Sequence, residues 1–188
     1  YYTLRYLLVA LLAEGESLVR GPALSDDTAV LVRALRALGA AATWERDDAR
    51  DAAAGAGEAG RAWALRVRGT GGRLRVPPGG VLEMGNAGAV LRLLLGLGAL
   101  LPAVRFTTDH PASLGRRPNR DLVDALAALG IQSEAAGPEG YLPIALRGGP
   151  PAGGAVTVSG ARSSQYLSAL LFVGPLLARG LEITVTDD

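Results

Sequence analysis

The sequence predicts an α+β fold that repeats one unit of strand, helix, strand, helix and one or two closing strands. An apolar helical run that ends near Gly and leads into a short β-prone run occurs three times, at residues 5–20, 92–108 and 166–186. An amphipathic helix that closes with Leu-Gly and leads into a strand occurs twice, at residues 25–45 and 116–134. The alternating stretches WALRVRG (63–69) and YLPIALRG (141–148) predict closing strands with one buried face.

The ends of the two amphipathic helices are predicted from their capping residues. Ser25 is a suitable N-cap, and the two Asp residues after it favour the positive end of the helix dipole. Gly39 ends that helix. In the second amphipathic helix, Pro118 suits the first turn and Gly130 marks the stop. Both helices are therefore short and bounded by turns.

These elements divide the chain into one domain of three repeats. We expect unit one at residues 1–76 with a truncated start, unit two at 77–149 and an incomplete unit three at 150–188. The alanine-rich stretch 47–62 is predicted to be a surface loop between two strands of unit one. Because the second helix of unit three does not occur before residue 188, we expect the chain to be a fragment.

Composition excludes several classes of protein. The chain has no Cys and a single His, His110, which argues against metal sites and imidazole catalysis. Its 19 basic and 18 acidic residues give a net charge of +1, so no basic field indicates a nucleic acid or membrane partner. The apolar run 90–104 is too short to span a bilayer, and no basic leader precedes the apolar start. We expect a cytoplasmic protein.

The start of each repeat's leading helix carries polar groups that differ between repeats. These starts read TLR at 3–5, GNAGAVLR at 85–92 and RSSQY at 162–166. The first N–H groups of a helix are unpaired and carry partial positive charge, and Gly allows a ligand to approach the backbone. If the repeats pack side by side, the three starts could bind a phosphorylated small molecule. Taken alone, Ser163 or Ser164 is explained as well by simple helix capping.

Three arginines bear on the same question. Arg92 lies within an apolar helix and needs a partner, for which an internal carboxylate would serve as well as a substrate. Arg116 and Arg117 precede Pro118 at a helix start. Two cations at the positive end of a helix dipole are unfavourable, and an anion bound there would offset the cost. A solvated pair is the alternative.

Four stretches together resemble the 5-enolpyruvylshikimate-3-phosphate (EPSP) synthase family over nearly the whole chain. They are RYLLVALLAEG with SDDT (5–15, 25–28), LEMGNAGAVLRLLLGLGALLP (82–102), SLGRRPNRDLVDALAALG (113–130) and GARSSQYLSALLFVGPLLARG (160–180). The resemblance implies one of two similar domains, each with three βαβαββ units, helices packed inside and mixed sheets outside. The second, catalytic domain would be absent from this chain, and the active site would lie in the cleft between the two.

The resemblance implies transfer of the enolpyruvyl group of phosphoenolpyruvate to the 5-hydroxyl of shikimate 3-phosphate, with release of phosphate, on the route to chorismate and the aromatic amino acids. It implies no metal and no organic cofactor. Matched by position, the residues implied to bind shikimate 3-phosphate are Arg5, Ser163, Ser164 and Gln165. Those implied to bind phosphoenolpyruvate are Asn86, Gly88, Arg117 and Gln165.

The resemblance implies no general acid or base in this chain, because the family's Lys would precede Tyr1 and its acids belong to the other domain. We therefore expect weak binding of shikimate 3-phosphate at best and no turnover by the fragment, and a monomer at full length. Two alternatives remain. The sister transferase that acts on UDP-N-acetylglucosamine carries a Cys in its loop, which this chain lacks. A non-catalytic module that binds phosphate ligands is the other.

Overall fold

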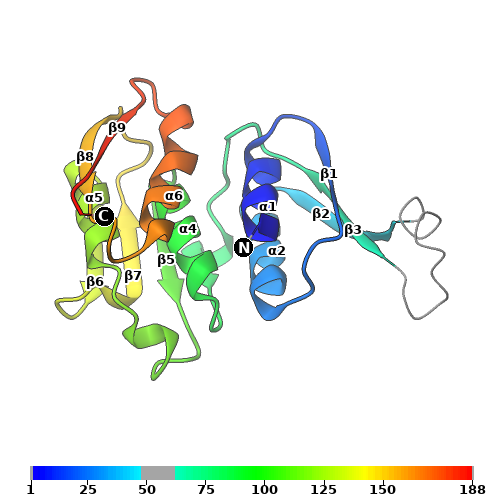
Figure 1. Cartoon of the computed structure of the whole chain (residues 1–188), viewed down its shortest axis with the longest axis horizontal. Coiled ribbons are helices and arrows are strands. Elements are labelled where there is room, and N and C mark those ends of the chain that lie inside the picture. Colours follow the sequence, from blue (N-terminus) through cyan, green and yellow to red (C-terminus); the bar gives the residue numbers. More distant parts are fainter. Residues whose placement is uncertain (1, 48–61, 188) are drawn as a thin grey trace. The chain divides into compact units, whose positions relative to one another are not determined.

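The computed structural model describes residues 2–47 and 62–187. The chain divides into two compact units, residues 1–73 and 74–188. Figure 1 labels most of their helices and strands. The division falls close to the predicted boundary after residue 76, and the predicted second and third repeats lie together in the second unit. The three-repeat division of the chain stays a prediction.

The first unit follows the predicted order of helix, strand, helix and two strands. Its elements are α1 (Tyr2–Leu12), β1 (Glu16–Arg20), α2 (Asp26–Ala37), β2 (Ala41–Arg46) and β3 (Trp63–Arg68). The strands form an antiparallel sheet in the order β1-β3-β2. Helices α1 and α2 contact each other, and their buried Leu and Val side chains form the core together with Leu65 and Val67 of β3.

Capping interactions set the ends of α2 as predicted. The Ser25 hydroxyl accepts a hydrogen bond from the Thr28 backbone N–H at 3.2 Å. Gly39 follows the helix with a φ of 108°, a backbone conformation that residues other than glycine rarely adopt. Of the predicted loop at 47–62, residues 48–61 lie outside the described part of the chain. The connection from α2 to β2 therefore forms as the local sequence indicates.

The second unit contains a complete βαβαββ repeat followed by a βαβ segment. The complete repeat comprises β4 (Val81–Glu83), α4 (Gly88–Gly98), β5 (Ala103–Thr107), α5 (Arg120–Ala128), β6 (Gln132–Ala136) and β7 (Tyr141–Arg147). The segment comprises β8 (Gly154–Val158), α6 (Ser164–Val173) and β9 (Leu181–Val185). Short 3-10 helices occur at Pro78–Gly80, Leu114–Arg116 and Gly174–Leu176. The predicted element order is confirmed.

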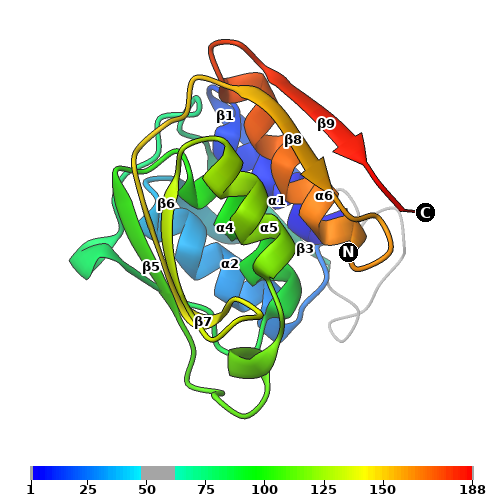
Figure 2. The same cartoon turned by 90° about the vertical axis from the view of Figure 1, so that its left-hand side faces the viewer.

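The strands of the second unit form two sheets with helices between them. One sheet is mixed, in the order β4-β5-β7-β6, with β4 parallel to β5 and the other pairs antiparallel. The other is the parallel pair β8-β9. Helices α4, α5 and α6 lie between the two sheets, as Figure 2 shows. The predicted α+β class, with helices inside and mixed sheets outside, is confirmed.

The close crossing of α4 and α6 depends on a glycine. Almost every residue of α4 after its first turn is buried, with Arg92 the half-buried exception. A Cβ at Gly96 would lie 2.7 Å from the Ala169 carbonyl oxygen of α6. The missing side chain therefore lets the two helix backbones approach each other.

The start of α5 differs from the prediction. Pro118 was expected in the first helical turn, but α5 begins at Arg120 and Asn119 occupies the N-cap position. The fully buried Asn119 side chain donates hydrogen bonds to the Arg117 carbonyl at 2.8 Å and the Gly140 carbonyl at 3.1 Å. These contacts hold residues 117–119 against the β6–β7 turn, so the helix starts two residues later than Pro118.

Candidate functional site

The GNAG turn places a glycine at the first position of α4. Gly85 has a φ of 50°, which allows the chain to turn sharply after β4. Asn86 is exposed, and Gly88 is the buried first residue of the helix. The N-cap residue, Ala87, has no side-chain hydrogen bond to the helix. The N-cap side chain, which often accepts a hydrogen bond from one of the first N–H groups of a helix, therefore does not do so in α4.

Arg117 lies directly against this helix start. A Cβ built at Gly88 would overlap the Nη1 atom of Arg117. Arg117 is exposed, and no carboxylate among the described residues lies within 4.0 Å of its guanidinium. A guanidinium and a helix N-terminus thus present positive charge at one place. Such an arrangement favours an anion with several oxygens.

The start of α6 presents hydroxyl and amide groups. Ser163 is the N-cap, and its hydroxyl accepts a hydrogen bond from the Gln165 backbone N–H at 3.2 Å. Ser164 is exposed and is the first helical residue. No acid lies in the first turn. Capping therefore accounts for Ser163, but it uses neither the Ser164 hydroxyl nor the Gln165 amide.

Arg92 connects α4 to the start of α6. Its Nη1 atom donates a hydrogen bond to Gln165 Oε1 at 2.9 Å and a longer one to the Ser163 hydroxyl at 3.4 Å. Its guanidinium carbon lies 5.2 Å from the centre of the Tyr166 ring. These partners are neutral, and no ion pair of Arg92 occurs in the part of the chain described. The sequence left a carboxylate and a substrate as alternatives, and the structure places uncharged side chains there.

Tyr166 fixes the first turn of α6 in the core. It is 2% exposed, and its hydroxyl donates a hydrogen bond to the Pro118 carbonyl at 2.7 Å. Burial raises the pKa of the Tyr166 phenol above its ordinary value, although the nearby Arg92 guanidinium opposes this effect. The phenol therefore remains a neutral donor at physiological pH. Through it, α6 contacts the segment that contains Arg117.

The two flanking arginines have different surroundings. The Arg162 Nε lies 3.5 Å from Asp121 Oδ2, and its Nη1 lies 3.5 Å from Glu139 Oε2. The sequence left open whether Arg162 flanks a ligand or faces solvent, and in the structure it pairs with two carboxylates. Arg116 is exposed at the end of the 3-10 helix Leu114–Arg116.

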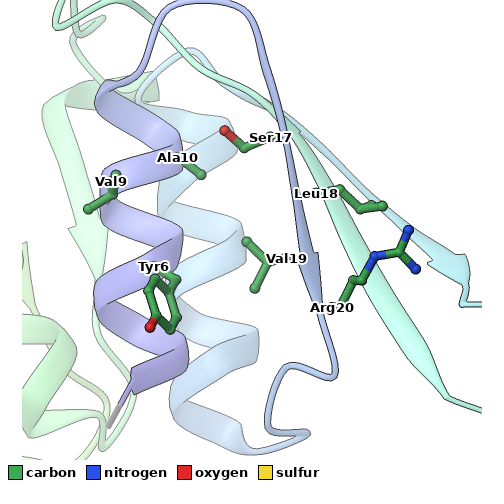
Figure 3. Close-up of a pocket in the computed structure, with 7 residues that line it drawn as sticks. All are labelled: Tyr6, Val9, Ala10, Ser17, Leu18, Val19 and Arg20. Carbon is green, nitrogen blue, oxygen red and sulfur yellow. The ribbon is translucent and has the colours of Figure 1, made fainter. Parts of the chain in front are cut away.

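All of the predicted site residues except Arg5 lie within the second unit, and contacts join some of them. Arg92 contacts Ser163 and Gln165, and Arg117 contacts Gly88. Arg5 lies half-buried on α1, in the first unit. Next to it in sequence, Tyr6 lines a groove of about 370 Å³ between α1 and β1, which Figure 3 shows and which no predicted site residue lines.

Sequence reasoning did not assign a role to Tyr166 or Glu83. Tyr166 follows the polar RSSQ stretch, yet nothing in the sequence indicates a bond to Pro118, which is 48 residues away. Glu83 lies within the LEMGNAG stretch, and its position before a Gly-rich turn was the available signal.

Among residues 2–47 and 62–187, no cluster of His, Asp and Glu side chains could hold a metal ion. The helices in these ranges are all too short or too polar to cross a membrane.

Comparison with solved structures defines the class of protein. An EPSP synthase from Acinetobacter baumannii superposes with a TM-score of 0.73 and 26% sequence identity, over 92% of this chain and 35% of that chain. Together with the βαβαββ order and the polar starts of α4 and α6, this similarity defines part of an enolpyruvyl transferase fold.

The family follows from the sequence comparisons. The family model of EPSP synthase (3-phosphoshikimate 1-carboxyvinyltransferase) matches residues 1–187. The 3-phosphoshikimate 1-carboxyvinyltransferase of Deinococcus radiodurans is 47% identical over 188 residues, which are 100% of this chain and 38% of that protein. That of Methanosphaerula palustris is 37% identical over 185 residues, 98% of this chain and 40% of that protein. The chain belongs to the EPSP synthase family, and it spans less than half the length of these relatives.

Proposed function

We propose that this chain supplies the shikimate 3-phosphate-binding half of an enzyme that transfers the enolpyruvyl group of phosphoenolpyruvate to shikimate 3-phosphate. The observation that carries the proposal is the contact of Arg92 with both Ser163 and Gln165 at the start of α6. Arg92 holds the uncharged Ser163 and Gln165 side chains at the N-terminus of α6. Among the described residues, no carboxylate forms an ion pair with the Arg92 guanidinium. That combination suits a phosphate monoester.

The residues of α6 are proposed to bind shikimate 3-phosphate. The Ser163 and Ser164 hydroxyls donate to its phosphate oxygens, and the Gln165 amide contacts both substrates. Arg5 is proposed to bind the carboxylate of the same substrate with its planar guanidinium. The positive end of α6 and the Arg92 guanidinium then stabilise the bound phosphate.

The start of α4 is proposed to bind phosphoenolpyruvate. Asn86 and the backbone at Gly88 face this substrate, and Arg117 binds its phosphate or carboxylate. Both substrates are anions that repel each other, so fixed donors and guanidinium groups must offset this repulsion when they meet. Holding the 5-hydroxyl against the enolpyruvyl carbon also removes much of the entropic barrier.

The general acid and base are proposed to come from a part of the longer protein outside residues 1–188. This part includes the second catalytic domain, which closes the cleft over the two substrates. We therefore expect no phosphate release from the 188-residue chain alone. The whole protein is proposed to act as a monomer in the cytoplasm. Light scattering of the full-length protein would check the monomeric state.

A titration of the 188-residue chain tests the binding half of the proposal. Shikimate 3-phosphate is expected to shift the backbone amide resonances of Ser163, Ser164 and Gln165, with weak affinity because the second domain is absent. Shikimate without the phosphate should cause much smaller shifts. If UDP-N-acetylglucosamine shifts these amides and shikimate 3-phosphate does not, the substrate assignment is wrong. If neither ligand has an effect, binding by this chain is refuted.

Replacing Gly88 with alanine is expected to weaken phosphoenolpyruvate binding by about 10-fold, the loss expected for one charge-assisted contact. The new methyl group would overlap the Arg117 guanidinium and displace it from the helix start. Since the overlapping atom is the end of a flexible side chain, the free energy of unfolding should change by less than about 1 kcal/mol.

Arg117→Met is the matched comparison for this variant. If Gly88→Ala acts through Arg117, the double variant should bind phosphoenolpyruvate no more weakly than Arg117→Met alone. The measurement is a phosphoenolpyruvate titration of all variants with shikimate 3-phosphate present. Additive losses in the double variant would show that Gly88 and Arg117 act independently.

A further inference from the structure

Glu83 occupies the last position of β4, directly before the GNAG turn. Its register partner on the parallel strand β5 is Thr107, the last residue of that strand. Glu83 is exposed, and no cation lies within ion-pair distance of its carboxylate among the described residues. A structural ion pair therefore does not explain this acid.

The Glu83 carboxylate instead accepts hydrogen bonds from both sides of the turn. Its Oε1 atom accepts from the backbone N–H of Gly85 at 3.2 Å and from that of Asp109 at 3.1 Å. Its Oε2 atom accepts from the Thr107 hydroxyl at 2.7 Å. One side chain thus joins the start of the GNAG turn to the residues that follow β5.

Further bonds hold the same two segments together. The Thr108 hydroxyl donates to the Gly85 carbonyl, and the Met84 N–H donates to the Thr107 carbonyl at 2.9 Å. The N–H of Gly85 is therefore bonded to the last residue of β4, and its C=O to the residue directly after β5. Gly85 precedes Asn86 by one residue and the first residue of α4 by three. The direction in which Asn86 and the N–H groups of α4 point depends on this turn.

The charge of Glu83 works against an anion bound at this helix start. Hydrogen bonding explains why an acid occupies this position, because a carboxylate can accept several hydrogen bonds and donates none. We propose that Glu83 is a positioning residue that orients the GNAG turn for the second anionic substrate. The inference rests on the proposed function, in which that substrate is phosphoenolpyruvate.

Glu83→Ala should weaken phosphoenolpyruvate binding to the 188-residue chain by about 10-fold, as expected for losing charge-assisted hydrogen bonds to two backbone groups. The titration is followed by amide shifts with saturating shikimate 3-phosphate. Shikimate 3-phosphate affinity, read at Ser163 to Gln165, should stay within about 2-fold because the hydrogen bonds of the Glu83 carboxylate go to Gly85, Thr107 and Asp109 and not to the start of α6. Exchange of the Gly85 and Asp109 amide hydrogens should become faster. Glu134→Ala, the same change at an exposed position of β6, is the matched control.

Glu83→Gln separates orientation from charge. The amide oxygen can accept the Gly85 and Asp109 N–H bonds, so phosphoenolpyruvate affinity should stay near that of the unmodified chain. If Gln and Ala both increase the affinity, Glu83 acts only through its charge and the inference is wrong. Equal affinity in Glu83→Ala and the unmodified chain also overturns it. If the unmodified chain binds neither substrate, the proposed function itself fails, and this result is seen before any variant is made.

Discussion

Replacing Arg92 with methionine is expected to weaken shikimate 3-phosphate binding by about 10- to 100-fold, since a hydrogen bond to a charged group contributes ~1.5–3 kcal/mol. Methionine keeps most of the apolar length of the side chain but loses the guanidinium, whose Nη1 atom donates both hydrogen bonds. Gln165 and Ser163 then lose the contact that fixes them at the start of α6. Positive charge next to the proposed phosphate position is lost as well. The amide-shift titration with shikimate 3-phosphate measures the effect.

Two further variants define what Arg92 contributes. Arg33→Met makes the same chemical change at an exposed position of α2 and should leave the affinity unchanged. Arg92→Lys keeps the charge but not the planar group of donors, so its affinity should fall between those of the unmodified chain and Arg92→Met. An Arg92→Met chain that binds shikimate 3-phosphate as tightly as the unmodified chain would refute the proposed role.

Gly96→Val is expected to lower the free energy of unfolding of the second unit by about 3 kcal/mol, the upper part of the usual range for overpacking a core. The first carbon of the new side chain would lie 2.7 Å from the Ala169 carbonyl oxygen and 3.0 Å from the Ala169 Cβ. Backbone atoms cannot rotate away from this contact, so α4 and α6 must move apart. Denaturant unfolding followed by the exchange of α4 and α6 amides measures the loss.

The control for this prediction is Ala89→Val, which places the same branched side chain on the half-buried first turn of α4. It should cost about 1 kcal/mol or less, mainly through the lower helix propensity of valine. If Gly96→Val is no more destabilising than Ala89→Val, the two helices do not cross as closely as described.

Local sequence was sufficient wherever an element depends on its own residues. The Ser25 cap and the glycines at 39 and 130 bound their helices as predicted, because capping and left-handed turns are decided within a few residues. Alternation in YLPIALR predicted a strand with one buried face, and Tyr141–Arg147 is such a strand. The start of α5 was placed wrongly because Asn119 is held by the Gly140 carbonyl, a contact between segments 21 residues apart.

The candidate site divides in the same way. The GNAG and RSSQ stretches indicate polar helix starts from local sequence, and the combination of motifs indicates the family, which the comparisons confirm.

The partners of Arg92, Arg162 and Glu83 could not be predicted from the sequence. Ser163 is 71 residues from Arg92, and Asp109 is 26 residues from Glu83. A charged side chain pairs with whatever the packing of helices and strands brings within reach, and no periodic pattern in the sequence encodes that choice. Element type, element order and family therefore follow from local sequence, whereas the hydrogen bonds that orient the site follow from tertiary packing.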